Sequence, residues 1–409
     1  MKRKRVGIVG GGAAGMAAAI AAARQGADVT VLERNDRVGK KILVTGNGKC
    51  NLGNQQLDLG QYYGSCPEWI QQALQRFSTE DTIRFFQGIG LLIKSRNGYL
   101  YPACEQASAV LDVLRYEMES LGVKLICECK INRIERDAVS GEIVVGDGAR
   151  QYAFDAVILA CGSKASPRTG SDGSGYKLAK QLGHRLIPTV PALVQLKCRE
   201  DYMKAVAGVR ADGTLRIYRG NECVGVERGE LQLTEYGISG IPVLQVSRIV
   251  NYILREEKEV KVVIDFLPDY DEGAYQEMCE GRALLQTGRT VEEFFTGILH
   301  KKLMQLFVKM AGLKGNMPME QADKEALLQV YRLCKGWCLH ITGSNSYDNA
   351  QVCAGGVDTA QITENMESKL VPGVYFAGEI LDVDGKCGGY NLHWAWCSGI
   401  LAGEEAAKQ

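Results

Sequence analysis

Three glycines near the start of the chain have the type and spacing of a dinucleotide phosphate site. Gly10, Gly12 and Gly15 fit the pattern G-x-G-x-x-G. In this pattern the first glycine permits a tight turn, the second lets a pyrophosphate approach the backbone, and the third lets helix and strand pack closely. The free N–H groups and the dipole of the following helix favour the negative charge of phosphates. The stretch therefore predicts a dinucleotide site, with an ordinary glycine-rich turn as the alternative.

Glu33 and the loop after it could hold the rest of a dinucleotide. Glu33 comes about 20 residues after the glycines, where a carboxylate accepts hydrogen bonds from ribose hydroxyls. Residues 34–54 combine positive charge, glycines and short polar side chains, among them Lys41, Thr45 and Asn51. A loop of this composition can wrap a phosphate or a polar cofactor chain. The alternative is a solvated loop rich in turn-forming residues.

A second glycine–acid pair near the C-terminus favours FAD over a nicotinamide as the resident cofactor. Gly378 and Glu379 follow a short strand-like run, and residues 382–391 again combine glycines with polar residues. FAD needs such a second segment, because its ribityl chain and flavin run from the first helix across the sheet to another loop. The helix predicted over residues 392–408 would aim its first N–H groups at the flavin pyrimidine, where reduction places negative charge.

Two side chains beside this segment could act on a substrate. His393 lies in the first turn of the last helix and is a candidate proton donor, with a structural hydrogen bond or a solvent-facing position as the alternative. Tyr390 could donate its hydroxyl to the substrate or simply pack on the flavin. Cys50 and Cys387 lack the C-x-x-C spacing of a dithiol relay. With four histidines and no zinc-type cysteine pairs, we expect no metal site.

The elements that must position these residues alternate between strand and helix. Residues 6–9 and 29–32 are typical of buried strands, and an alanine-rich helix is predicted between them over residues 13–23. A further buried strand, residues 156–160, runs into a turn at Gly162. A strand that ends in a small-residue turn suits the carboxyl edge of a parallel sheet, where ligands bind.

Other short motifs predict helix caps, turns and module boundaries along the chain. Ser78 is a plausible helix cap, and the pair Asn97-Gly98 predicts a hairpin turn. Near residue 191 the predicted secondary structure changes. Residues 192–265 hold short β-like runs separated by turn signals such as Asp212-Gly213, and a helical pattern follows them. After this helical pattern the strand and glycine-turn pattern of the first domain returns, so we expect that domain to be interrupted by inserted modules.

Length and composition limit the number of domains, the possible partners and the cellular compartment. At 409 residues the chain is too long for one core. Lys+Arg and Asp+Glu balance at 48 each, which gives no electrostatic reason to expect nucleic acid or an anionic membrane as partner. No apolar stretch is long enough to span a bilayer, and 14 cysteines would be hazardous in an oxidising compartment. We expect a cytoplasmic protein with a small-molecule substrate, and the oligomeric state stays open.

The chain resembles the YhiN-type flavoproteins, a family that includes aminoacetone-oxidase-like and BaiN-type bile-acid-pathway members. Four segments carry the resemblance and bracket the whole chain: residues 9–16 (VGGGAAGM), 39–51 (GKKILVTGNGKCN), 354–359 (AGGVDT) and 373–397 (GVYFAGEILDVDGKCGGYNLHWAWC). The chain departs from the family at Lys49, Asn47, Gly53 and His393, where arginine, glycine, threonine and glutamine are usual or common.

The resemblance implies an α/β fold: a Rossmann-like FAD domain of the glutathione-reductase type in two chain segments, with inserted β-barrel-like and helical modules. The expected boundaries are 1–191 and 351–409 for the FAD domain, 192–268 with 336–350 for the barrel module, and 269–335 for the helical module. The resemblance implies FAD contacts from Gly10, Gly12, Ala13, Ala14, Gly15, Glu33, Lys41, Thr45, Gly46, Gly48, Asn51, Gly378, Glu379, Gly389, Tyr390, Asn391 and Leu392. Four further residues, Arg34, Cys50, Ala160 and Gly162, are expected to join them.

Three function hypotheses remain. The first is an FAD-dependent oxidoreductase that passes hydride between flavin and a small organic substrate, as a reductase of an enone or steroid-like C=C bond with NAD(P)H as transient donor. The second is an oxidase of a small amine such as aminoacetone, which regenerates its flavin with oxygen. The third is a non-enzymatic flavin-binding or RNA-modification accessory protein. The sequence favours the reductase.

Overall fold

The computed structural model describes residues 3–285 and 288–408. It divides into two compact units. Unit 1 comprises Met1–Val190 with Ala350–Gln409, and unit 2 comprises Pro191–Asn349. Residues 1–2, 286–287 and 409, which fall within the domain segments expected from the sequence, lie outside the described residues.

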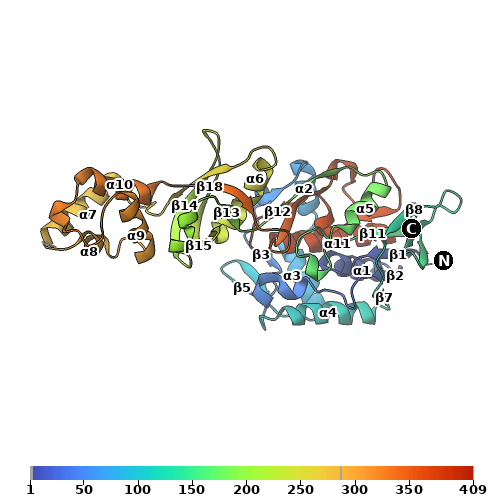
Figure 1. The fold of residues 1–409 in the computed structure, drawn as a ribbon. Coiled ribbons are helices and arrows are strands. Elements are labelled where there is room, and N and C mark those ends of the chain that lie inside the picture. The colour runs from blue at the N-terminus through green and yellow to red at the C-terminus, as the bar shows by residue number, and fades with distance from the viewer. Residues whose placement is uncertain (1–2, 286–287, 409) are drawn as a thin grey trace. The chain divides into compact units, whose positions relative to one another are not determined.

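The centre of unit 1 is a five-stranded parallel sheet (Figure 1). Its inner strands are rich in valine, isoleucine and leucine and are largely buried on both faces, as parallel strands covered by helices must be, whereas the edge strand Lys124–Ile126 is largely exposed. The strand from the C-terminal segment lies at one edge, so both chain segments build one sheet. In spatial order the strands are β20 (Val374–Phe376), β11 (Ala156–Leu159), β1 (Arg5–Val9), β2 (Asp28–Leu32) and β7 (Lys124–Ile126).

Two helices from opposite ends of the chain pack against each other in unit 1. They are α1 (Ala13–Arg24) and α11 (Tyr390–Ala407). A Cβ placed on Gly399 or Gly403 of α11 would lie 2.4 or 2.3 Å from a carbonyl oxygen of α1. The two helices therefore meet backbone to backbone, which only small residues allow.

Shorter elements complete unit 1. Ser78 caps its helix with a reciprocal capping box, and Asn97-Gly98 turns its hairpin with both φ angles positive, so both local predictions are confirmed. The further helices are α2 (Pro67–Gln75), α3 (Thr79–Gly88), α4 (Ala107–Ser120) and α5 (Ser174–Gln181). The smaller sheets are β8 (Arg133–Arg136) with β9 (Ile143–Gly146) and β10 (Gln151–Phe154), β3 (Gly53–Asn54) with β5 (Ile93–Arg96) and β6 (Tyr99–Pro102), β12 (Leu186–Ala192) with β19 (Val352–Val357), and β4 (Tyr62–Tyr63) with β21 (Asp384–Gly385).

Unit 2 contains a closed six-stranded barrel and a set of helices. The rings of Phe266, Phe307 and Trp337 pack against one another in tilted and edge-to-face contacts, so barrel and helices share one apolar core. The barrel order is β13 (Leu196–Cys198), β16 (Gly237–Ser239), β15 (Glu222–Thr234), β14 (Arg210–Arg219), β17 (Val260–Asp265) and β18 (Trp337–Ser344). The helices are α6 (Ile241–Ile253), α7 (Glu272–Leu285), α8 (Val291–Phe295), α9 (Lys301–Met310) and α10 (Lys324–Lys335).

The local prediction for the β region was wrong in two places. Asp212-Gly213 does not turn the chain but lies inside β14, where it pairs with Glu230 and Gly229 of β15. A glycine in a strand also marks close approach of another backbone, and a Cβ on Gly213 would lie 2.9 Å from the carbonyl oxygen of Asp265. The prediction of short strands over residues 192–265 also left out the helix α6, whose apolar face is buried.

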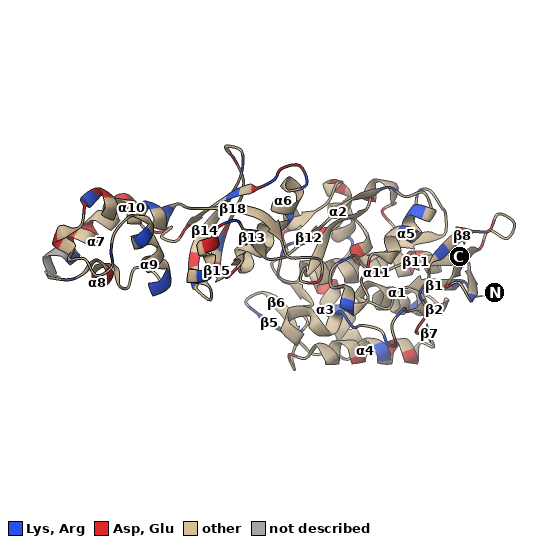
Figure 2. Cartoon of the chain, in the orientation of Figure 1, with Lys and Arg blue, Asp and Glu red and all other residues tan. Residues whose placement is uncertain are grey.

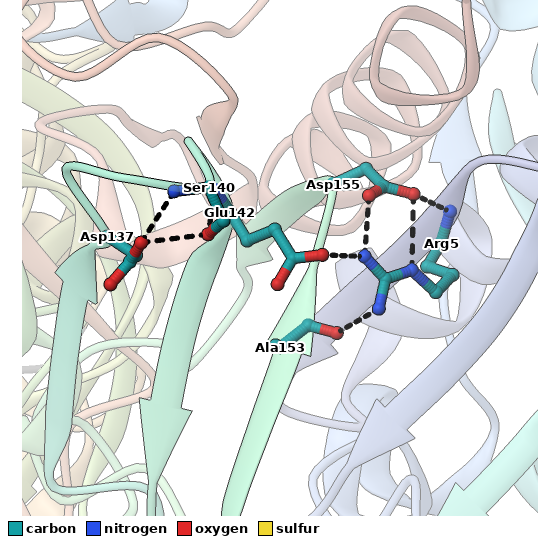
Figure 3. A network of polar contacts seen from close by, with 6 residues as sticks. All are labelled: Arg5, Asp137, Ser140, Glu142, Ala153 and Asp155. Atoms are coloured by element: carbon teal, nitrogen blue, oxygen red, sulfur yellow. Dashed lines mark hydrogen bonds and ion pairs between the residues drawn. The ribbon is translucent and has the colours of Figure 1, made fainter.

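Arg5 ties the parallel sheet to the neighbouring antiparallel sheet (Figure 3). Its backbone N and its Nη2 each donate to Asp155 at 2.7 Å, and Nη1 donates to the carbonyl oxygen of Ala153 at 3.3 Å. Nη2 also donates to Glu142, which directly precedes β9 and follows the turn Asp137–Ser140. Because Arg5 is the first residue of β1, this network fixes the end of the strand that lies opposite the glycine turn.

We expect Arg5→Ala to lower the thermal midpoint by about 2–6 °C. Charged hydrogen bonds contribute about 1.5–3 kcal/mol when buried and less when partly solvated, and a domain of this size shifts by about 2–4 °C per kcal/mol. The measurement is thermal unfolding followed by circular dichroism. The matched control is Arg133→Ala, whose guanidinium forms its one ion pair among the described residues with the exposed Glu135. Equal shifts in the two variants would contradict the assigned role of Arg5.

Candidate functional site

The expected cofactor residues gather at the carboxyl ends of four neighbouring strands of unit 1. Gly10 follows β1, Glu33 follows β2, Ala160 follows β11, and Gly378 comes soon after β20. In open parallel sheets, ligands bind at this edge because loops and helix N-termini converge there. The structure therefore brings both chain segments of the expected site together.

The three glycines of the turn have three different surroundings. Gly10 has φ +108°, and a Cβ on it would lie 2.5 Å from the carbonyl oxygen of Ala160. A Cβ on Gly15 would lie 1.9 Å from the carbonyl oxygen of Gly10. Around Gly12, no atom of the described residues lies within 4 Å of the corresponding position. The first and third glycines are therefore required by packing, and the second faces the open space that a pyrophosphate would fill.

Glu33 is buried and already holds part of the loop around it. Its Oε2 accepts from the backbone N of Gly11 at 2.8 Å, and its Oε1 accepts from the backbone N and from Nδ2 of Asn35 at 2.8 Å each. A carboxylate has about four acceptor sites, so about one remains for a ribose hydroxyl. Asn35, which positions this carboxylate, was missed by the sequence analysis, since an asparagine in a polar loop gives no distinctive signal.

Lys41 and Glu379 join the two cofactor segments by an ion pair. Lys41 Nζ lies 2.6 Å from Glu379 Oε2 and donates to the carbonyl oxygen of Ala165 at 3.3 Å. The other oxygen of Glu379, Oε1, is buried and has no hydrogen-bond partner within the described part of the chain. A buried carboxylate oxygen without a donor is costly, so this atom fits a ligand hydroxyl such as those of a ribityl chain.

The loop 45–53 meets the start of α11. In the orientation that satisfies its neighbours, the Asn51 amide donates to the carbonyl oxygen of Gly53 at 2.7 Å and accepts from the backbone N of Gly389 at 3.2 Å. Gly389 has φ +96°, and a Cβ on it would lie 2.6 Å from the same oxygen of Gly53. Glycine is therefore required at 389 by contacts within the protein itself. Thr45 donates its hydroxyl to the carbonyl oxygen of Ile42 at 2.7 Å, which stabilises the turn before Gly46 and Gly48.

The first residues of α11 also shape the loop before it. The Asn391 amide accepts from the backbone N of Gly385 at 2.9 Å and donates to the Gly385 oxygen at 2.8 Å. The Tyr390 hydroxyl accepts from the backbone N of Asp58 at 3.3 Å, and Tyr62 donates to the Tyr390 carbonyl at 2.9 Å. These side chains hold the loops in place. The backbone N–H groups of Tyr390, Asn391 and Leu392 are the free donors of a helix start.

His393 is buried between α11 and α3. Its Nδ1 lies 3.0 Å from Thr82 Oγ1, and its ring packs on Phe77. Burial lowers the pKa of His393 to about 4, so the imidazole is neutral near pH 7. Thr82, 311 positions away in the chain, was missed as its partner. The catalytic roles expected for His393 and Tyr390 stay predictions.

The remaining expected residues line the same edge of unit 1. Burial raises the pKa of the Cys50 thiol to about 12, so this thiol stays protonated at neutral pH. Arg34 forms an ion pair with Asp172 and donates to the carbonyl oxygen of Gly170 at 3.3 Å. Gly162 packs beside Ser171. Ala13 and Ala14 open α1 directly after Gly12.

These features fit FAD. The glycine turn and the start of α1 suit its pyrophosphate, Glu33 its adenosine ribose, and the Lys41–Glu379 pair its ribityl chain. The fold and the site therefore define a Rossmann flavoprotein of the glutathione-reductase type.

The chain belongs to the family described as "HI0933-like protein Rossmann domain", which matches residues 4–405. It is 44% identical over 408 residues to the 3-dehydro-bile acid delta(4,6)-reductase of Clostridium scindens, with 99% of both chains covered. It is also 30% identical over 409 residues to the ribosomal RNA dihydrouridine synthase of Haemophilus influenzae, with 98% of both covered. Among solved structures, a 3-ketosteroid-delta4-(5alpha)-dehydrogenase from Rhodococcus jostii has a TM-score of 0.51 at 19% identity, covering 99% of this chain and 97% of that one.

The expected fold class and the expected YhiN-type family are confirmed, and the chain is an FAD-dependent oxidoreductase. The likeness to the Rhodococcus structure concerns the fold alone. Among the described residues, no helix is both long and apolar enough to cross a membrane.

The glycine turn yields a matched pair of variants. Gly12→Ala should leave the thermal midpoint of the apoprotein unchanged, because its Cβ meets no described atom, and should weaken FAD binding at least tenfold by occupying the phosphate space. Gly15→Ala should instead destabilise the apoprotein, because its Cβ would overlap the Gly10 oxygen. Titration of each apoprotein with FAD, together with thermal unfolding, checks both. Unchanged FAD affinity in Gly12→Ala would contradict the phosphate assignment.

His393 predicts a pH dependence of stability. A histidine with a lowered folded pKa stays neutral in the folded protein, while the unfolded chain takes up a proton below about pH 6.5. Its contribution is present above pH 6.5 and is lost as pH falls toward 4, by a few kcal/mol. We expect His393→Gln to flatten the fall in stability between these pH values, as measured by urea unfolding. The exposed His300→Gln is the control, and equal curves for both variants would contradict the prediction.

Proposed function

We propose that the chain reduces a C=C bond conjugated to a carbonyl group in a small steroid-like substrate, with NAD(P)H as transient donor. The observation that carries the proposal is the full-length similarity, at 44% identity, to a bile-acid reductase whose name places the reduced bonds at positions 4 and 6 of a 3-oxo sterol acid. The net reaction consumes NAD(P)H and one proton, adds hydride to the β-carbon and the proton to the α-carbon, and releases NAD(P)⁺.

When bound, FAD supplies the two-electron carrier between the donor and the substrate. The residues of the chain bind and tune that carrier. Gly12 leaves room for the pyrophosphate, Glu33 fixes the adenosine end, and Lys41 holds Glu379 with one oxygen free. The N-terminus of α11 favours negative charge nearby by about 0.3–2 kcal/mol, which supports the reduced, anionic form of a flavin.

Transient docking of NAD(P)H is part of the proposal. The sequence contains no second G-x-G-x-x-G, so a dedicated nicotinamide domain is not expected. In such an arrangement the donor leaves before the substrate enters, and the two half-reactions can be measured separately.

A second candidate function is the reduction of uridine to dihydrouridine in ribosomal RNA. It is favoured by the two relatives named as ribosomal RNA dihydrouridine synthases, at 30% and 29% identity over nearly the whole chain. Uridine also carries a C=C bond conjugated to a carbonyl, so the same chemistry would apply to it. The balance of 48 cationic and 48 anionic side chains weighs against a strongly salt-dependent RNA contact.

Anaerobic stopped-flow spectroscopy tests the proposal in two steps. NADH and NADPH are first compared as reductants of the flavin. The reduced protein is then mixed with a 3-oxo-4,6-diene sterol acid, with oxygen, or with an rRNA transcript that lacks dihydrouridine. We expect the sterol to reoxidise the flavin at least a hundredfold faster than the other two. Faster reoxidation by oxygen would favour the amine oxidase, and dihydrouridine formed in the transcript would favour the second candidate.

A further inference from the structure

One face of α9 carries two neighbouring rows of side chains. Met304 and Val308 lie one helical turn apart and are 5% and 4% exposed. Beside them, Lys301, Gln305 and Lys309 follow one another at intervals of four residues, which places them along one line of the helix. Figure 2 shows the positive charge on this helix. The face is therefore apolar along one line and polar along the next.

A cavity of about 420 Å³ lies along this face in unit 2. Phe295 of α8, Leu299 and Leu313 line it together with the apolar row of α9. The helix rises about 12 Å between positions 301 and 309, at about 1.5 Å per residue. The volume falls in the range of small-molecule sites, about 300–1,000 Å³, which are mostly apolar with a few placed polar groups.

The charged side chains that line the cavity do not balance: Lys301, Lys309 and Lys314 line it together with a single carboxylate, that of Glu292. Glu292 is occupied: its Oε1 accepts from Gln305 Nε2 at 2.9 Å and lies 3.1 Å from Lys301 Nζ, and its backbone N donates to the carbonyl oxygen of Gly315 at 2.9 Å. Neither Lys309 nor Lys314 makes an ion pair with any described residue. Lys309 complements the dipole at the end of its helix, but Lys314 lies on the loop beyond, so the dipole does not account for it.

We infer that this cavity is a binding site for an amphipathic carboxylate, a molecule with one apolar body and one anionic end. The apolar body would cover Met304, Val308 and Phe295, and the carboxylate would meet Lys309 and Lys314. A small inorganic anion would leave the apolar lining in water, and an extended polyanion would meet the carboxylate of Glu292. The site lies in unit 2, whereas every expected cofactor residue lies in unit 1, so it is distinct from the FAD site and does not depend on the proposed function.

Isothermal titration of the full-length, FAD-loaded protein with sodium octanoate and, separately, sodium cholate tests the inference, both below their micelle concentrations. We expect one saturable site for at least one of these probes, and the probe that binds tells an acyl body from a sterol body. The variant Lys309→Glu/Lys314→Glu should weaken binding at least tenfold, because two attractions become repulsions. The matched control Lys258→Glu/Lys324→Glu reverses two exposed charges of unit 2 outside the cavity and should bind as the unmodified protein does.

Three further measurements sharpen the result. 1-Octanol, which keeps the apolar body without the charge, should bind at least tenfold more weakly than octanoate. Sodium phosphate and a short RNA should not compete with the carboxylate. FAD content and thermal midpoint should be the same in both double variants. Absence of saturable binding, an equal loss of affinity in the control, or competition by phosphate or RNA would each overturn the inference.

Discussion

The backbone contact between α1 and α11 is the constraint on which the rest of unit 1 depends. Gly399 and Gly403 face the carbonyl oxygens of Ala14 and Ala18, and a single added methyl on either glycine would overlap them. This contact places the last helix against the helix that follows the glycine turn. Both helix N-termini then lie at the same edge of the sheet, where the strands end.

The same contact positions the second cofactor segment. From α11, the Ser398 hydroxyl accepts from the backbone N of Gly378 at 2.8 Å, and Trp394 Nε1 donates to the Gly378 oxygen at 3.2 Å. Gly378 itself lies against Ala14, where a Cβ would be 2.8 Å from the alanine methyl. These contacts hold Glu379 beside Lys41. The packing of α11 thus helps to fix the position of Glu379 Oε1, the oxygen that has no hydrogen-bond partner among the described residues.

The sequence predicts the parts of this fold that short-range chemistry determines. The G-x-G-x-x-G turn, the cap at Ser78 and the turn at Asn97-Gly98 each depend on a few adjacent residues. Asp212-Gly213 has the same local composition as a turn, but ten residue pairs with β15 draw it into a strand. The pairing of Glu33 with Asn35 and that of His393 with Thr82 went unpredicted, because neither polar contact leaves a pattern in the sequence.

His393 departs from the family pattern, but this difference does not by itself indicate a different reaction. The imidazole is buried and neutral, and it bonds to the Thr82 hydroxyl and to the backbone of Phe77. A glutamine, common at this position in the family, is also neutral, and its amide can exchange the same hydrogen bond with a hydroxyl. Either residue can therefore fill this position as a buried neutral group that bonds to Thr82. Differences in substrate between relatives must then arise from other side chains, those that face the substrate.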